Sequence, residues 1–395
     1  MSQSRSQSRD HSIARRLDAV VNEYGEGRLP RRDFLRWIAT AGAAVGLVGG
    51  PFGLGGRASA AQSIRFDGWG GAVSEAFRDY AFLPFSIETG VEVEEGEFGN
   101  MDAYLDKVKK SFPPGGTYNL AQLTGLFDYA RYVGLGYDSV LDESKITRLG
   151  TVMAPLIAPY REISAGGLSA VPYNIGQTGI AYNTKRIKPE QAEELGASLL
   201  WDEKLVKGKL GAWGDWRTNI WLAALHTGQC PNNIDTMELV WSALKEQKKL
   251  VKKYWHSGAE FEELMRKGTI HASTAWSGRV AKLQQAGEPI GWLAPRNTFT
   301  WQQCIFVLRG TDMDLACKLL DWMLTPAAAI AVAEAQLYPP SLDPTQVELT
   351  EVVKKLPAFD PTGKLEGCLF PDPVYWFSNQ LDWAEHWKKI MDGKA

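Results

Sequence analysis

The chain has 395 residues, of which 45% are hydrophobic and 23% charged. This length and composition are typical of a soluble globular protein with a core large enough for two domains. The formal net charge is −3 at pH 7 and no concentrated basic face is visible, which disfavours nucleic acid as the main partner.

Residues 1–60 resemble a twin-arginine export signal. The basic run RRDFLR at 31–36 precedes an uncharged, weakly hydrophobic stretch at 37–56, and the small-x-small pattern ASA follows at 58–60. Many glycines and a proline interrupt the hydrophobic stretch, which argues against a membrane anchor. We therefore expect the twin-arginine machinery to export the chain, cleavage near Ala60, and a mature protein that is soluble in the periplasm.

From residue 62 onwards, short strand-like runs alternate with longer helical patterns. Such alternation predicts a parallel sheet covered by helices. The predicted strands are 63–66, 91–97, 117–123, two runs within 169–183 that share a Pro-Tyr-Asn turn, one beginning within 207–213, 268–276, 291–294 and 301–310. The predicted helices are 72–89, 100–111, 218–225, 237–254, 277–286, 314–324 and 326–336.

Motifs of common catalytic and cofactor sites are missing from the sequence. The histidines show no H-x-x-x-H or H-E-x-x-H spacing, and neither G-x-S-x-G nor a Walker loop occurs. Gly68, Gly70 and Gly71 follow the first strand as in a dinucleotide-binding loop, but Val73 stands where the third glycine is required. We therefore expect no metal, no cofactor and no catalysis.

The four cysteines are far apart, and none lies in a C-x-x-C pair. Zinc, iron–sulfur and thiol-redox sites are therefore disfavoured. Buried free thiols are the expected state, and one disulfide in an oxidising compartment is an alternative. The residues are Cys230, Cys304, Cys317 and Cys368.

The feature of the sequence that points to a function is its content of fifteen tryptophans. An aromatic wall suits a ligand with methylene segments, because it offers a large apolar contact and attracts cations over its face. Any one tryptophan could instead pack the core, so the argument depends on a group at strand ends and turns. This group comprises Trp69, Trp213, Trp216, Trp276 and Trp301.

Several segments together resemble one family. "FDGW", "TGVEV", "GTYNLAQL", "SAVPYNIGQTGIAYN", "GASLLWDEKLVKGKLG", "GDWRTNIWLAAL", "STAWSGRVAKLQQAGEPIGWLAP" and "ACKLLDWMLTPAAAIAVAEAQLYPPSLD" follow one another from about Ser63 onwards. Their order and spacing resemble the extracellular solute-binding proteins of ABC importers, with the spermidine/putrescine-binding type as the closest branch.

The resemblance implies an α/β protein with the two-lobe, type II periplasmic binding protein fold. Each lobe would be a mixed, mainly parallel sheet flanked by helices, and crossing strands would form the hinge. The first lobe would comprise 61–172 with 303–340, and the second 173–302 with 341–395. The implied partners are a small-molecule solute and an ABC permease in the inner membrane, and the implied state is a monomer.

The resemblance also implies a ligand site between the lobes. In polyamine binders, aromatic residues hold the methylene chain and carboxylates bind the ammonium ends. At six positions this chain has a residue with the chemistry that the pattern requires, and at a seventh position it has a glutamine. The predicted ligand-binding residues are Trp69, Thr124, Asp215, Trp276, Trp301, Gln303 and Tyr338.

Two departures from the polyamine pattern change the expected ligand. Thr218 and Gln303 stand where that pattern has acids, and a buried ammonium without a carboxylate loses a charge-assisted hydrogen bond of about 1.5–3 kcal/mol. Arg217, Arg279 and Arg296 lie beside the predicted site. If one of them points inward, a carboxylate, sulfonate or zwitterion fits better than a diamine.

An alternative hypothesis from another functional class is that the protein is a redox enzyme exported by the twin-arginine route. Proteins that fold around cofactors before crossing the membrane often use this route. The missing Cys and His clusters and the missing dinucleotide motif count against it.

Overall fold

The computed structural model describes residues 62–99, 101–111, 117–164, 166–366 and 368–394. The predicted export signal lies outside the described residues. Within them, nine strands form one sheet in the order β2-β1-β3-β9-β4-β7-β5-β6, and β8 pairs with β4. The strands are β1 (Ser63–Gly68), β2 (Glu92–Glu97), β3 (Leu120–Thr124), β4 (Ala170–Asn183), β5 (Leu210–Trp213), β6 (Val251–Trp255), β7 (Ala272–Trp276), β8 (Ile290–Leu293) and β9 (Phe299–Val307).

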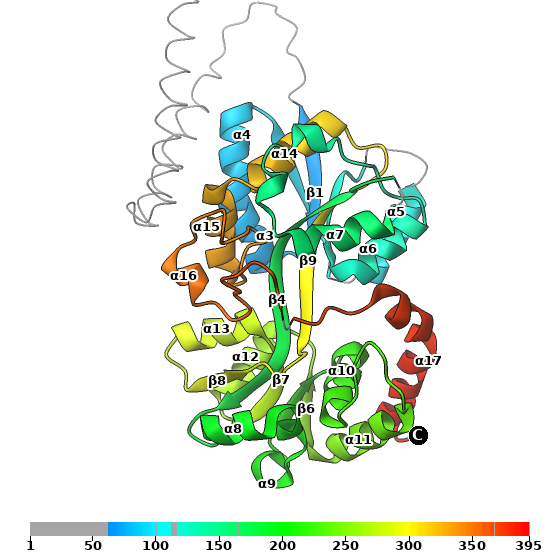
Figure 1. Cartoon of the computed structure of the whole chain (residues 1–395), viewed down its shortest axis with the longest axis vertical. Helices are drawn as coiled ribbons and strands as arrows, with labels where there is room; N and C mark the ends of the chain where they lie inside the picture. Colours follow the sequence, from blue (N-terminus) through cyan, green and yellow to red (C-terminus); the bar gives the residue numbers. More distant parts are fainter. Residues whose placement is uncertain (1–61, 100, 112–116, 165, 367, 395) are drawn as a thin grey trace, which may run out of the picture.

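The sheet is divided between two lobes that are stacked along the long axis of the molecule (Figure 1). In the first lobe β1 pairs in parallel with β2 and β3, and in the second lobe β5 pairs in parallel with β6 and β7. Strands β4 and β9 run antiparallel to each other through both lobes. The first lobe joins this pair through β3, and the second joins it through β7 and β8.

Helices cover the faces of both halves of the sheet. Those of the first lobe are α3 (Gly71–Phe77), the π-helical turn η1 (Arg78–Phe82), α4 (Leu83–Thr89), α5 (Met101–Ser111), α6 (Gly125–Gly134), α7 (Ala154–Ile163), α14 (Met313–Met323), α15 (Pro326–Gln336) and the short turns η2 (Glu143–Lys145) and η3 (Leu149–Thr151). Those of the second lobe are α8 (Pro189–Leu195), η4 (Gly196–Trp201), α9 (Glu203–Val206), α10 (Trp216–His226), α11 (Met237–Leu250), α12 (Gly258–Arg266) and α13 (Ser277–Gln285).

The C-terminal part of the chain contacts both lobes. Helix α16 (Glu351–Lys354) places Val353 in the same hydrophobic cluster as β1, β3 and the helices of the first lobe. Helix α17 (Pro373–Asp392) buries Trp376, Trp383 and Trp387 against α10 and α11 of the second lobe. The two ends of this segment are therefore attached to different halves of the molecule.

Two local predictions are wrong. The Pro-Tyr-Asn segment is no turn, because β4 continues through it with only a register shift between Pro172 and Asn174. The helix predicted over 237–254 ends at Leu250, and its last residues form β6 beside β5. The helix predicted over 72–89 is confirmed as a continuous helical run from Gly71 to Thr89. Within it the π turn η1 ends two residues before Pro84, a residue without an N–H to donate.

The four cysteines are free thiols. Cys304 and Cys317 are buried, as expected, whereas Cys230 is exposed. Burial raises the pKa of Cys304 to about 12, so this thiol stays protonated at neutral pH.

No single helix in the described residues has the length and apolar character that a membrane span requires. Helices α14 and α15 pass that test only as a pair, and the pair is bent by 69°.

Candidate functional site

The strand register places the last residues of β3 in the first lobe and of β7 in the second lobe beside the middle of the crossing strands β4 and β9. Thr124, the last residue of β3, is opposite Gln303 of β9, which is in turn opposite Asn174 of β4. From the other lobe Trp276, the last residue of β7, is opposite Thr178 of β4. The carboxyl ends of the parallel strands in both lobes therefore point toward 174–178 of β4, and such strand ends are where α/β proteins place ligand sites.

A chain of neutral polar side chains lies at this junction. Gln122 Nε2 donates to the hydroxyl of Tyr173, and that hydroxyl donates to Gln303 Oε1. Asn174 Nδ2 donates to the same oxygen at 3.2 Å, and Gln303 Nε2 donates to Thr124 Oγ1 at 3.4 Å. Burial raises the pKa of Tyr173 well above its usual value, which keeps its hydroxyl protonated and able to donate.

Trp69 is attached to the same network by its backbone. Its N–H donates to Gln122 Oε1 at 3.0 Å, and its ring packs edge-on against Phe98 with 4.9 Å between ring centres. Gly70 follows with a φ of 76°, a conformation that favours glycine. A Cβ at Gly70 would also come within 2.8 Å of the Glu97 carboxylate, so the glycine lets the loop turn tightly beside Trp69.

Trp301 and Tyr338 form a second aromatic contact. Their ring centres are 5.0 Å apart, and Trp301 Nε1 donates to Thr178 Oγ1 at 3.1 Å. Burial raises the pKa of Tyr338 to about 12, so this phenol is neutral at physiological pH. Gly278 at the start of α13 leaves room for the Tyr338 ring, which a Cβ would approach to 2.6 Å.

Trp276 belongs to a tryptophan cluster of the second lobe. Its ring meets Trp213 and Trp255 edge-on, with ring centres 4.9 Å and 5.1 Å apart. Trp213 ends β5 and leads to Asp215, so the cluster connects Trp276 to the loop that carries the predicted acid. Trp276 is only partly buried, which leaves part of its surface available for contact.

Asp215 is the N-cap of α10 and already has two partners. Its Oδ2 accepts the backbone N–H of Thr218 at 3.0 Å, and Arg217 Nη1 lies 3.5 Å from its Oδ1. The carboxylate therefore compensates the helix N-terminus and one cation of the protein itself. The Thr218 side chain, which replaces a family acid, is buried at the start of the same helix.

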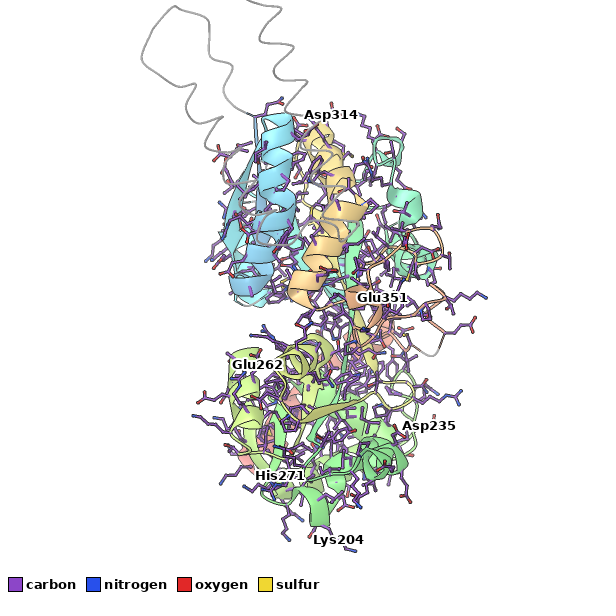
Figure 2. All side chains as sticks on the ribbon, turned by 90° about the vertical axis from the view of Figure 1, so that its left-hand side faces the viewer. Lys204, Asp235, Glu262, His271, Asp314 and Glu351 are labelled. Carbon is purple, nitrogen blue, oxygen red and sulfur yellow. The ribbon has the colours of Figure 1, made fainter. Side chains whose placement is uncertain are left out.

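The other two arginines have different surroundings. Arg279 Nη1 donates to the buried Glu262 Oε1 at 3.1 Å, and Lys282 Nζ lies 2.9 Å from Glu262 Oε2. Figure 2 shows Glu262 at the end of the second lobe that faces the first. Arg296 is exposed in the turn before β9. Of the three arginines, Arg217 is thus the one that accompanies the predicted acid.

The structure joins the predicted site residues in three groups. Trp69, Thr124 and Gln303 share the polar network, Trp301 contacts Tyr338, and Trp276 is connected with Asp215 through Trp213. The sequence prediction missed Gln122, Tyr173 and Asn174. Their signal was a polar side chain inside an otherwise apolar strand, at "NLAQL" and "AVPYN". No group of three or more His, Cys, Asp or Glu side chains in the described part of the chain forms a candidate metal site.

Solved structures of known proteins share this architecture. The spermidine/putrescine ABC transporter substrate-binding protein PotD from Streptococcus pneumoniae has a TM-score of 0.68 and 20% identity, with 83% of this chain and 99% of that one covered. A GABA receptor has a TM-score of 0.68 and 20% identity, with 83% and 97% covered. At these identities the likeness shows the fold alone, and it confirms the predicted two-lobe periplasmic binding protein fold.

Comparisons at the level of sequence agree with the fold. The spermidine/putrescine-binding periplasmic protein 1 of Haemophilus influenzae is 25% identical over 287 residues, which cover 71% of this chain and 77% of that protein. The family model of bacterial extracellular solute-binding proteins matches residues 81–361, more than half of the chain. This family is a component of solute transport and not a class of enzymes. The protein belongs to the bacterial extracellular solute-binding proteins.

Proposed function

We propose that the protein is the periplasmic substrate-binding component of an ABC importer, and that it captures a small polar organic solute between its lobes for delivery to an inner-membrane permease. The observation that carries the proposal is the junction at 174–178 of β4, because the last residues of β3 and β7, one strand from each lobe, pair with the crossing strands there. Closure of two lobes around such a junction is an established switching motion. Export through a twin-arginine signal at 1–60 and action as a monomer complete the proposal.

A polyamine such as putrescine or spermidine is the first candidate solute. The Haemophilus influenzae relative and the Streptococcus pneumoniae structure are both named for these compounds. Partly buried tryptophan rings suit methylene segments and cations, and Asp215 supplies one carboxylate. The proposed contacts are Trp69, Thr124, Asp215, Trp276, Trp301, Gln303 and Tyr338.

A zwitterion or a small carboxylate is the second candidate, and the position of Arg217 favours it. The guanidinium lies 3.5 Å from Asp215, so the ammonium of a polyamine would compete with a cation that is already present. Gln303 is uncharged and engaged in the polar network. A solute with one ammonium and one carboxylate can pair with both Asp215 and Arg217. The GABA receptor shows that this fold is associated with such a solute in another protein.

Isothermal titration and thermal unfolding with putrescine, spermidine, GABA and small dicarboxylates test both candidates. A solute at one hundred times its dissociation constant stabilises the folded protein by about 2.7 kcal/mol. Stabilisation by the two polyamines alone supports the first candidate, and stabilisation by GABA or the acids supports the second. If none of these compounds binds, both named candidates are wrong.

Arg217→Gln distinguishes the candidates further. Removal of the cation frees Asp215, so the ratio of putrescine affinity to GABA affinity should rise about tenfold or more, as expected for a charge-assisted pair worth about 1.5–3 kcal/mol. The ratio is the useful quantity, because any effect of the substitution on lobe closure acts on both solutes alike. Arg296→Gln, at an exposed arginine, is the matched control. An unchanged ratio in Arg217→Gln would remove this residue from the site.

A further inference from the structure

Helices α6 and α17 belong to different lobes and touch each other (Figure 1). Helix α6 is fixed in the first lobe, where Leu126 and Tyr129 are part of the core. Helix α17 is fixed in the second lobe by its buried tryptophans. A contact between these helices therefore spans the boundary between the lobes.

Phe127, on the first turn of α6, contacts two side chains of the second lobe. The Phe377 ring of α17 lies 5.8 Å away between ring centres. The Arg217 guanidinium of α10 lies over the Phe127 ring at 4.9 Å from its centre, and over the Trp216 ring at 4.6 Å. All three distances are within the range of attractive aromatic and cation–π contacts.

Phe377 is much more exposed than its neighbour Trp376 on the same helix. Its neighbour Trp376 is buried in the second lobe, whereas Phe377 is 51% exposed although it contacts Phe127. It therefore contributes little to attaching α17 to its own lobe, and its described ring contact is with the first lobe. Arg217 is likewise partly exposed and lies between Asp215 of its own lobe and Phe127 of the other.

We propose that Phe127, Arg217 and Phe377 form an interlobe clasp, which holds the lobes together in the absence of solute and thereby sets how tightly a solute is bound. Separation of α6 from α10 and α17 would break both contacts, the Phe127–Phe377 ring pair and the Arg217 guanidinium over Phe127. A solute binds more weakly when the competent arrangement is only a fraction of the population, so loss of the clasp reduces its apparent affinity by that fraction. The effect on affinity rests on the proposed function, whereas the effect on the lobes rests on the contacts alone.

Small-angle X-ray scattering of the ligand-free protein tests the clasp. The test compares the wild type with Phe127→Ala, Phe377→Ala and the double variant. The ratio of molecules with α6 and α17 in contact to molecules with the lobes further apart should fall about two- to tenfold in each single variant, seen as a larger radius of gyration. The double variant should add little to Phe127→Ala, because both single changes remove the same ring pair. Leu381→Ala is the control, since Leu381 is on α17 and 79% exposed.

Phe127→Tyr keeps an aromatic ring at the centre of the clasp and should scatter like the wild type. Phe377→Ala removes an exposed side chain, so it keeps the test decisive if Phe127→Ala does not fold. Scattering profiles of Phe127→Ala and Phe377→Ala equal to that of Leu381→Ala would overturn the clasp. Because these measurements use no solute, their failure is separate from failure of the proposed function, which the titrations with putrescine and GABA decide.

Discussion

Gly176 leaves the space that the indole of Trp301 occupies. A Cβ at Gly176 would come within 2.3 Å of Trp301 Cη2, closer than real contacts allow. We expect Gly176→Ala to displace the indole from Tyr338 and Thr178, and to lower the free energy of unfolding by about 1–3 kcal/mol, as overpacking typically does. Denaturant unfolding measures this change.

Gly134→Ala is the matched control for this substitution. A Cβ at Gly134, the last residue of α6, meets no atom within 4 Å. This change should be neutral or stabilise by up to about 1 kcal/mol, since alanine is the better helix former. Equal effects of the two substitutions would show that the space at Gly176 is unimportant.

At the scale of single residues, some features follow from the sequence and others depend on the register of the strands. The glycines after β1 mark a loop in the sequence, and Gly70 has the positive φ that a tight turn beside Trp69 requires. The network through Gln122, Tyr173 and Asn174 could not be predicted, because it depends on the register of β3, β4 and β9. A one-residue shift in any of these strands would turn the side chains to the other face.

Helix α17 shows how one element is held by a few large side chains. Trp383 is buried, and its ring lies 5.1 Å from Trp376 and 5.6 Å from Tyr375. Trp383→Ala should lower the free energy of unfolding by about 3–5 kcal/mol, because it removes a large buried side chain and leaves a cavity. Thermal or urea unfolding measures the loss, and Leu381→Ala on the exposed side should have little effect. Similar curves for the two variants would mean that α17 is not anchored by its tryptophans.

Elements with a clear periodic pattern could be predicted from the sequence, and those decided by neighbours could not. Helices α14 and α15 agree with their predicted ranges within one residue at either end. In contrast, 251–254 continues the apolar spacing of α11 but pairs with β5, and Val251, Tyr254 and Trp255 are residue types that favour strands. The continuous β4 was missed because Pro172 and Asn174 resemble a turn, although a bulge in the strand accommodates the proline.

The molecule as a whole has separate hydrophobic cores, which are connected by β4, β9 and the segment between α16 and α17. One large cluster contains residues of β1, β3, α5 and α6 and the carboxyl-terminal part of β9, from Cys304 to Val307. The clusters around α10, α13 and α17 lie in the other lobe. The fold class could be predicted from the order of sequence motifs, and the solved structures confirm it. The boundary of each lobe depends on how the chain crosses between them, which no periodic pattern specifies.

Two matched substitutions test whether the lobes unfold separately. Leu105 on α5 and Leu283 on α13 are both fully buried, one in each lobe. We expect two transitions in calorimetry of the ligand-free protein, because each lobe has its own core and the described chain crosses between the lobes through β4, β9 and the segment between α16 and α17. Leu105→Ala should lower the midpoint of one transition and Leu283→Ala that of the other, since each removes about 2–5 kcal/mol from its own core. A single transition lowered by both substitutions would mean that the crossing strands and the contact of α6 with α17 couple the lobes into one cooperative unit.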